Sequence, residues 1–301
     1  MQEMKYFDNG GVRIAYRRFG DPLAPAVVLL MGLGLSMEAW PEGIVSGLLA
    51  EGFQVITPDN RDSGRSSRMT AWRVGRGDVL HAIVRTVFGL QVTGEYALED
   101  MAFDLERLLD HLGLRRVHVG GVSMGGMIAQ VFACQCPNRV ATLTSISSAV
   151  GNPRTGFGRL RAVAAVSASG DAASPEALRR HFTTVLTTLA GPRYRPDAAE
   201  LEEALSSAPR IGFDAAATRR QLVALLASGN RAQAMRQLRT PTLVIHGTDD
   251  PLLPFAAGEE TARLVAGAKL IPVDGLGHQL PPALMGTYAR WIATHCHAHP
   301  A

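Results

Sequence analysis

Gly121-Val122-Ser123-Met124-Gly125 lies between an apolar run typical of a strand, Val117–Val119, and a run typical of a helix, Met127–Phe132. A serine on a sharp strand-to-helix turn keeps its hydroxyl clear of the backbone. Glycines two positions before and two after the serine remove the side chains that would clash in such a turn. The turn also directs the amide N–H of Met124 and the positive end of the helix toward the space beside the hydroxyl. The pentapeptide therefore predicts a nucleophile elbow that presents Ser123.

Two later segments supply a carboxylate and a histidine. The run Pro241–Gly247 is apolar without alternation, which is typical of a buried parallel strand, and it leads into Thr248-Asp249-Asp250-Pro251. A carboxylate at the C-terminal end of a strand lies where an open α/β sheet places its functional groups. A further strand, residues 268–273, leads into Asp274-Gly275-Leu276-Gly277-His278, and the two glycines allow this loop to reach back toward Ser123. The order along the chain is therefore Ser, Asp, His.

This order and these contexts resemble the α/β-hydrolase superfamily over nearly the whole chain. The resemblance implies an α/β fold with a mostly parallel, eight-stranded sheet, flanking helices and an inserted helical cap. The superfamily segment Gly-x-x-Asp-x-x-x-Pro matches residues 247–254 and implies that Asp250, rather than its neighbour Asp249, orients the histidine. The superfamily segment Gly-x-Gly-His matches residues 275–278 and implies that His278 is the general base.

A second oxyanion donor is implied by the same resemblance. An apolar run, residues 27–30, leads into Met31-Gly32-Leu33-Gly34, where Met31 replaces the histidine that is usual in the superfamily. The donor is the backbone N–H of the residue after the first glycine, so Leu33 and Met124 are the candidate donors. Met31 leaves open how this loop is braced. The loops that converge on the serine are apolar, and the candidate substrate-pocket residues are Gly32, Leu35, Trp40 and Leu276. The segment from Met31 to Pro41 is most similar to a bacterial subgroup that includes the methylesterase acting on anthracycline antibiotics.

The residue types favour one reaction and leave others open. A Ser-His-Asp triad without a cofactor predicts hydrolysis of a carboxylic ester of a lipophilic or aromatic small molecule through an acyl-enzyme. A lactonase, a cofactor-free perhydrolase or a carbon–carbon bond hydrolase would use the same triad. The serine argues against a haloalkane dehalogenase or an epoxide hydrolase, which carry a carboxylate in the elbow. Outside enzymes, the fold can serve as a small-molecule receptor.

Length and composition favour one α/β core with an insertion. The 301 residues are 47% hydrophobic and 19% charged, which suffices for a full hydrophobic core. We expect the core to comprise residues 1–150 and 238–301, with the helical cap at 151–237. A second insertion at 69–94 contains an amphipathic stretch, Val79–Phe88. We expect the cap and this stretch to cover the elbow and to govern which ester is accepted.

The basic residues do not indicate a nucleic-acid partner. The net charge is only +3, and aspartates are interleaved with the arginines that crowd residues 61–85. No aromatic stacking pattern accompanies them, so local ion pairs on an exposed loop are expected. Within this segment, Arg61 and Ser66 are expected to be structural, because in the superfamily the loop supports the oxyanion loop.

Targeting and redox signals are sparse. No apolar stretch reaches eighteen residues and the N-terminus lacks a signal-peptide pattern, so we expect a soluble, cytoplasmic protein without a membrane partner. Cys134, Cys136 and Cys296 are expected to be free thiols, and no metal site is expected. His246 is expected to be a packed, hydrogen-bonded residue. The sequence leaves the oligomeric state open.

Overall fold

Eight strands form one sheet in the order β1-β2-β4-β3-β5-β6-β7-β8 in the computed structural model, which describes residues 3–167, 174–211 and 214–301. The pairs β1–β2 and β2–β4 are antiparallel, and all other neighbours are parallel. The strands are β1 (Lys5–Asn9), β2 (Val12–Phe19), β3 (Ala26–Leu30), β4 (Gln54–Pro58), β5 (Val117–Val122), β6 (Val140–Ile146), β7 (Thr242–Gly247) and β8 (Lys269–Val273). The predicted eight-stranded, mostly parallel α/β sheet is confirmed.

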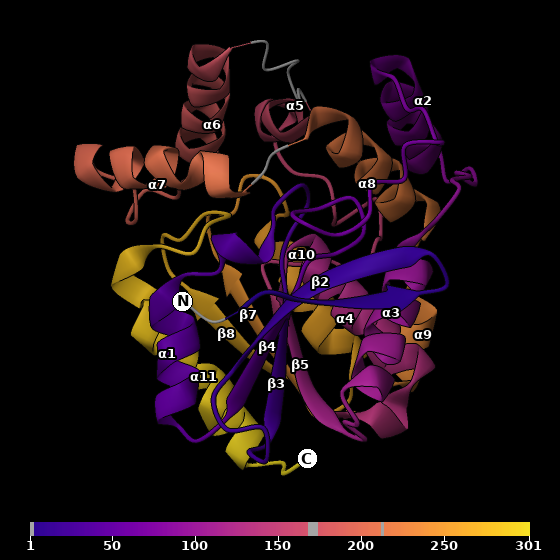
Figure 1. The fold of residues 1–301 in the computed structure, drawn as a ribbon. Coiled ribbons are helices and arrows are strands. Elements are labelled where there is room, and N and C mark those ends of the chain that lie inside the picture. The colour runs from indigo at the N-terminus through magenta and orange to yellow at the C-terminus, as the bar shows by residue number, and fades with distance from the viewer. Residues whose placement is uncertain (1–2, 168–173, 212–213) are drawn as a thin grey trace.

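Helices cover both faces of the sheet and its C-terminal edge (Figure 1). One face carries α1 (Glu42–Ala50) and α11 (Met285–His297), and the other carries α3 (Leu98–His111), α4 (Met124–Gln135), α9 (Ala232–Gln237) and α10 (Phe255–Leu264). Above the edge lie α2 (Arg76–Val87), α5 (Leu160–Ser167), α6 (Pro175–Leu189), α7 (Ala198–Ile211) and α8 (Ala215–Ala227). Within the described ranges, no helix has both the length and the apolar character that crossing a membrane requires.

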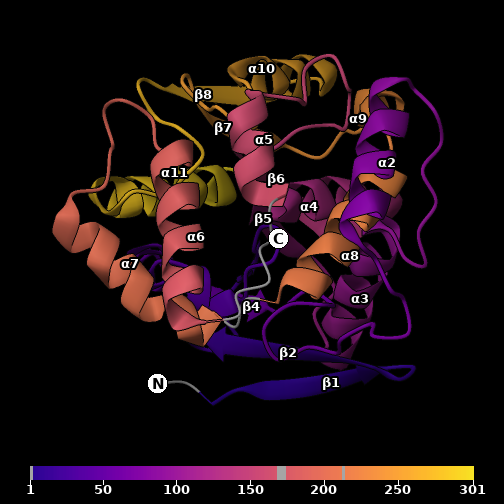
Figure 2. The same ribbon diagram turned by 90° about the horizontal axis from the view of Figure 1, so that it is seen from above.

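The helices above the edge fall into two groups (Figure 2). Seen from above, α6 and α7 lie on one side, α8 and α2 lie on the other, and α5 lies between them. The pair α2–α8 shares a small hydrophobic cluster in which Val79 and Ala82 pack near Val223 and Leu226. The remaining helix of the inserted segment, α9, packs against α4 and α10 beside the sheet.

The core consists of two hydrophobic clusters, one on each face of the sheet. Strands β3 and β6 are buried along their whole length, as expected for parallel strands covered on both sides. Helix α3 packs one apolar face against this core, because Leu98, Met101, Leu105, Leu108 and Leu109 are all buried. All three cysteines are free, as predicted.

The loop after β4, residues 59–66, differs from the exposed loop expected from its charges. Arg61 forms a buried ion pair with Asp104 of α3, with Nε and Oδ2 2.7 Å apart. Asp62 forms another with Arg220 of α8, with Oδ1 and NH2 2.6 Å apart. The prediction of local ion pairs on an exposed loop is therefore wrong for these residues. Their partners come from other helices, which bury the loop between the core and the helices above it.

Two buried histidines make the fold sensitive to acid. Burial lowers the pKa of His118 in β5 and of His295 in α11 to about 4, from an ordinary value of 6.5. Between these values the unfolded chain binds protons that the folded protein does not bind, so the free energy of unfolding should fall as the pH falls from about 6.5 to about 4. Urea midpoints measured across this range test the expectation. His118→Gln should weaken the dependence.

Candidate active site

Ser123 occupies the strand-to-helix turn between β5 and α4 with a strained backbone. Its φ of 55° and ψ of −121° lie outside the regions that residues other than glycine usually adopt. The flanking glycines are required sterically. A Cβ at Gly121 would lie 2.3 Å from the backbone of Gly125, and a Cβ at Gly125 would lie 2.0 Å from the Leu30 carbonyl oxygen. The elbow geometry predicted from the pentapeptide is therefore present.

Hydrogen bonds from the end of β6 and from the loop after it hold this turn in place. The Ser123 N–H donates to the Ile146 carbonyl at the end of β6, at 2.9 Å. The Ser148 hydroxyl donates to the Ser123 carbonyl at 2.8 Å. Gly32 also lies against the serine, since a Cβ on Gly32 would be 3.4 Å from the Ser123 Cβ and 4.0 Å from its Oγ. The turn and the loop after β3 therefore meet at the Ser123 side chain.

Asp250 and His278 form a hydrogen-bonded pair at the same edge of the sheet. The His278 Nδ1 lies 2.7 Å from Asp250 Oδ2, and the Asp250 side chain is completely buried. The other carboxylate oxygen accepts the N–H groups of Leu252 and Leu253, each at 2.9 Å. Asp250 is thereby fixed by three hydrogen bonds. The neighbouring Asp249 is exposed, and its carboxylate accepts the Thr248 hydroxyl.

The three side chains follow three parallel strands of the sheet. Ser123 follows β5, Asp250 follows β7 and His278 follows β8, so all lie at the C-terminal ends of parallel strands. Among the described residues, no hydrogen bond joins the Ser123 hydroxyl to the His278 imidazole. Catalytic hydrogen bonds of this kind are often long before the substrate is bound.

His246 packs behind Asp250, as expected. It is fully buried, its Nε2 lies 2.8 Å from the Leu253 carbonyl oxygen, and burial lowers its pKa. With Nε2 directed at this carbonyl, the Nδ1 atom of His246 is buried without a hydrogen-bond partner among the described residues. His246 therefore supports the loop that carries Asp250.

The loop after β3 is braced by the buried loop after β4. The Asn60 amide donates to the Met31 carbonyl at 3.0 Å. The Asp59 carboxylate accepts the N–H of Met37 at 2.6 Å and that of Arg65 at 2.7 Å. Burial raises the pKa of Asp59, and the two N–H groups oppose this effect. Hydrogen bonds from Asn60 and to Asp59 therefore brace the loop, which the Met31 side chain does not do.

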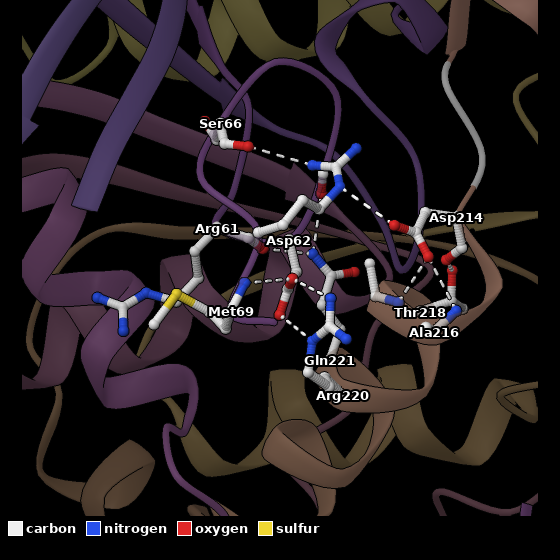
Figure 3. A network of polar contacts seen from close by, with 12 residues as sticks. Arg61, Asp62, Ser66, Met69, Asp214, Ala216, Thr218, Arg220 and Gln221 are labelled. Atoms are coloured by element: carbon white, nitrogen blue, oxygen red, sulfur yellow. Dashed lines mark hydrogen bonds and ion pairs between the residues drawn. The ribbon is translucent and has the colours of Figure 1, made fainter. Parts of the chain in front are cut away.

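Helix α8 contributes to the same brace (Figure 3). The Gln221 Oε1 accepts the Gly34 N–H at 2.8 Å, and its Nε2 donates to the Arg61 carbonyl at 2.7 Å and the Ser63 hydroxyl at 2.8 Å. The adjacent Arg220 pairs with Asp62 through two hydrogen bonds of 2.6 and 3.0 Å. The helix is therefore docked directly onto the loops beside Ser123.

Arg68 and the Asp214 N-cap fasten the beginning of α8. The Asp214 carboxylate accepts the N–H groups of Ala216 and Ala217 and lies 3.4 Å from the Arg68 guanidinium. Ser66, predicted to be structural, is one of the partners of this arginine through its carbonyl oxygen. Its hydroxyl donates to the Asp59 carbonyl and accepts the N–H of residue 15 in β2.

The turn between α6 and α7 holds the loop that carries His278. The Leu189 carbonyl accepts the His278 N–H at 2.8 Å. The Gln279 side chain accepts the Gly191 N–H at 3.1 Å and donates to the Tyr194 carbonyl. A Cβ on Gly191 would lie 2.3 Å from backbone atoms of residues 275 and 277. The two backbones therefore touch, and only glycine fits between them.

Gly191→Ala should lower kcat/KM by about 10²-fold, because a catalytic group displaced by about 1 Å loses this much rate. The added methyl group would push the loop of His278 away from its position, since both neighbours are backbone. The measurement is kcat/KM on an activated ester together with the melting temperature. Gly77→Ala is the matched control, because a Cβ there meets nothing within 4 Å. Equal rates for the two variants would show that the contact does not position His278.

The candidate pocket residues lie around the same loops with different exposures. Gly32 is beside Ser123, and Leu35 packs at the edge of the second hydrophobic cluster. Trp40 is 6% exposed and Leu276 is fully buried in that cluster. Their contact with a substrate stays a prediction.

Neither the contacts of Gln221 nor those of Leu189 and Gly191 with the loop of His278 could be predicted from the sequence. Neither forms part of a local motif. The only signal for Gln221 is a polar residue on the buried side of a predicted helix. Among the described residues, no group of three or more His, Cys, Asp or Glu side chains is arranged to hold a metal ion.

Known proteins resemble this chain over nearly its whole length. Residues 25–280 match the alpha/beta hydrolase fold family. Rhodomycin D methylesterase DnrP of Streptomyces peucetius is 27% identical over 314 residues, covering 96% of this chain and 97% of that protein. The bifunctional esterase/perhydrolase DCH of Acinetobacter calcoaceticus is 25% identical over 289 residues, covering 90% and 91%.

A solved structure has the same fold. The enol-lactonase from Burkholderia xenovorans superposes with a TM-score of 0.75 at 20% identity, covering 97% of this chain and 100% of that one. The resemblance inferred from the sequence, including the similarity to methylesterases, is confirmed. The chain belongs to the alpha/beta hydrolase fold family.

Proposed function

We propose that the protein is a serine hydrolase that cleaves a carboxylic ester of a lipophilic or aromatic small molecule through an acyl-enzyme. The observation that carries this proposal is the buried Asp250–His278 pair at the sheet edge where the strained elbow presents Ser123. A buried carboxylate that accepts two backbone N–H groups through one oxygen and lies 2.7 Å from His278 Nδ1 through the other fixes the imidazole tautomer with its proton on Nδ1. The Nε2 atom of His278 is then free to accept a proton.

The reaction proceeds in two halves. The Ser123 Oγ attacks the acyl carbonyl while its proton passes to His278 Nε2, and Asp250 stabilises the imidazolium that forms. The backbone N–H groups of Leu33 and Met124 donate to the oxyanion. Collapse of the intermediate breaks the bond to the alcohol, which leaves with the proton from His278. Water, activated by the same histidine, then hydrolyses the acyl-enzyme and restores Ser123.

The backbone of the oxyanion loop supports this assignment. The Leu35 N–H donates to the Gly32 carbonyl at 3.2 Å, which closes a turn with Leu33 and Gly34 at its centre. The Leu33 N–H has no acceptor among the described residues. An unused N–H beside Ser123 is what an oxyanion donor requires before the substrate binds.

The relatives favour an ester over the other substrates of this triad. Two similar proteins are named for esterase activity, and one of them is also named as a perhydrolase. We further propose that α5–α8, together with α2, form a cap that shapes the entrance to the site, because these helices lie above the edge that carries Ser123 (Figure 2).

A panel of esters tests the proposal. The purified protein should hydrolyse p-nitrophenyl esters and aromatic methyl esters, and an organophosphonate should label Ser123 at one equivalent per chain. Peroxide-dependent formation of peracid from a short carboxylic acid would identify a perhydrolase instead. Tight binding of an ester that is neither hydrolysed nor able to label Ser123 would identify a small-molecule receptor.

A further inference from the structure

We propose that Gln221, on the inserted helix α8, is a positioning residue for the oxyanion hole. The inference rests on the proposed esterase function, because it concerns the loop that carries the Leu33 N–H. Gln221 is completely buried, and each polar group of its side chain is used. Its carbonyl oxygen accepts from Gly34, and its amide donates to the hydroxyl of Ser63. The amide also donates to the carbonyl of Arg61 (Figure 3).

The contact with Gly34 fixes the orientation of the oxyanion turn. Gly34 has a φ of +70°, which a turn with Leu33 and Gly34 at its centre requires at its second central position. Its N–H is not used in the hydrogen bond that closes the turn and donates to the Gln221 Oε1 at 2.8 Å. The peptide plane between Leu33 and Gly34 is therefore held, and with it the adjacent plane that carries the Leu33 N–H.

The same face of α8 also limits where the loop can lie. A Cβ on Gly34 would be 2.6 Å from the Thr218 Oγ1, so the loop backbone rests directly against the helix. Thr218 and Gln221 are three residues apart and lie on one side of the helix. The buried Arg220–Asp62 pair holds the helix against the loop after β4. Helix α8 is therefore held against the oxyanion loop at Gly34 and against the loop after β4 at Asp62.

Gln221 braces the oxyanion loop from another part of the chain. The methionine at position 31 has no donor or acceptor suited to bracing the loop. A residue 187 positions away supplies the acceptor for Gly34 instead. A helix of the proposed cap thus takes part in positioning the catalytic groups, in addition to covering them.

The test compares Gln221→Met with Ser228→Ala. Methionine keeps the length of the side chain and removes all three hydrogen bonds. Ser228 is the C-cap of α8, where its hydroxyl accepts the Leu98 N–H at 2.8 Å and donates to the Glu99 carboxylate at 2.7 Å, so its loss weakens the docking of the same helix away from the oxyanion loop. Gln221→Met should lower kcat on a p-nitrophenyl ester by about 10-fold to 100-fold with KM changed less than about threefold, because a donor is displaced rather than deleted. Ser228→Ala should leave kcat within about twofold.

A transition-state analogue separates positioning from simple stability. A trifluoromethyl ketone forms a tetrahedral oxyanion on Ser123, so its Ki should rise with Gln221→Met by the same factor as kcat falls. The Ki of the alcohol product, which has no oxyanion, should not change. Gln221→Glu, which keeps an acceptor for Gly34 and loses both donors, should lie between the wild type and Gln221→Met, and it serves if the methionine variant does not fold.

Amide hydrogen exchange provides a readout that does not need activity. Peptides covering residues 31–37 should exchange faster in Gln221→Met and remain as in the wild type in Ser228→Ala. Wild-type kcat and ketone Ki in a folded Gln221→Met would overturn the positioning role while leaving the esterase intact. An inactive wild-type protein whose residues 31–37 respond as expected would overturn the esterase and confirm only the brace.

Discussion

Ser123→Ala should remove ester turnover by about 10⁴-fold or more while the protein stays folded. The hydroxyl is the only nucleophile proposed, and none of the hydrogen bonds that hold the elbow uses it, because they involve the Ser123 backbone. Alanine has the same Cβ as serine, so the space left by Gly32, Gly121 and Gly125 still suits it. The measurement is kcat/KM on an activated ester, with circular dichroism and the melting temperature to establish the fold.

Ser148→Ala is the matched control for this variant. It removes a hydroxyl next to the elbow and one hydrogen bond to the Ser123 carbonyl, so it should lower stability by about 1 kcal/mol and activity by less than about tenfold. Turnover in Ser123→Ala that approaches the wild-type rate, in protein free of wild-type contamination, would rule out the acyl-enzyme at this serine.

Asp250→Asn should lower kcat by about 10³-fold to 10⁴-fold, whereas Asp249→Asn should change it by less than about threefold. An asparagine at 250 can present its amide to His278 Nδ1, which would place the imidazole proton on Nε2 and block acceptance of the serine proton. It would also remove the charge that stabilises the imidazolium. Asp249 is exposed and contacts Thr248, so its replacement leaves the buried pair untouched.

The comparison of these two variants has a clear contrary outcome. If Asp249→Asn were the inactive protein, the orienting carboxylate would be assigned to the wrong residue of the Asp-Asp pair. Asp250→Asn keeps an oxygen for the N–H groups of Leu252 and Leu253 but replaces a buried, paired carboxylate, so the melting temperature must be measured with the rate. Labelling of Ser123 by a phosphonate should be slow in Asp250→Asn, because the nucleophile lacks a competent base.

The two neighbouring aspartates have different surroundings although they lie in one loop. Both follow β7, and the chain turns between them so that one side chain enters the protein and the other leaves it. Burial fixes Asp250 with three hydrogen bonds, while solvent surrounds Asp249. The proposed role of Asp250 rests on its burial and its hydrogen bond to His278, and that role stays a prediction.

The sequence by itself determined the sheet, the helices on its faces and the elbow. Strand and helix patterns depend on the spacing of apolar residues, and the elbow depends on glycines within two positions of Ser123, so each is a property of a short segment. The strands predicted at residues 27–30, 241–247 and 268–273 begin and end within one residue of β3, β7 and β8. The order Ser, Asp, His could also be taken from the chain, because each candidate follows a predicted strand.

Only the tertiary structure decided how the site is held together. The charged loop at 59–66 was expected to be exposed, and it is buried because Asp104 and Arg220 reach it from two helices. Gln221 accepts a hydrogen bond from Gly34, which lies 187 positions earlier in the chain. Leu189, at the end of α6, accepts a hydrogen bond from His278. Local periodicity carries no information about such pairs, since their energy depends on the packing of whole helices against loops. The candidate site residues could therefore be predicted from short segments of the sequence. The contacts that hold these residues in place depend on the folded chain.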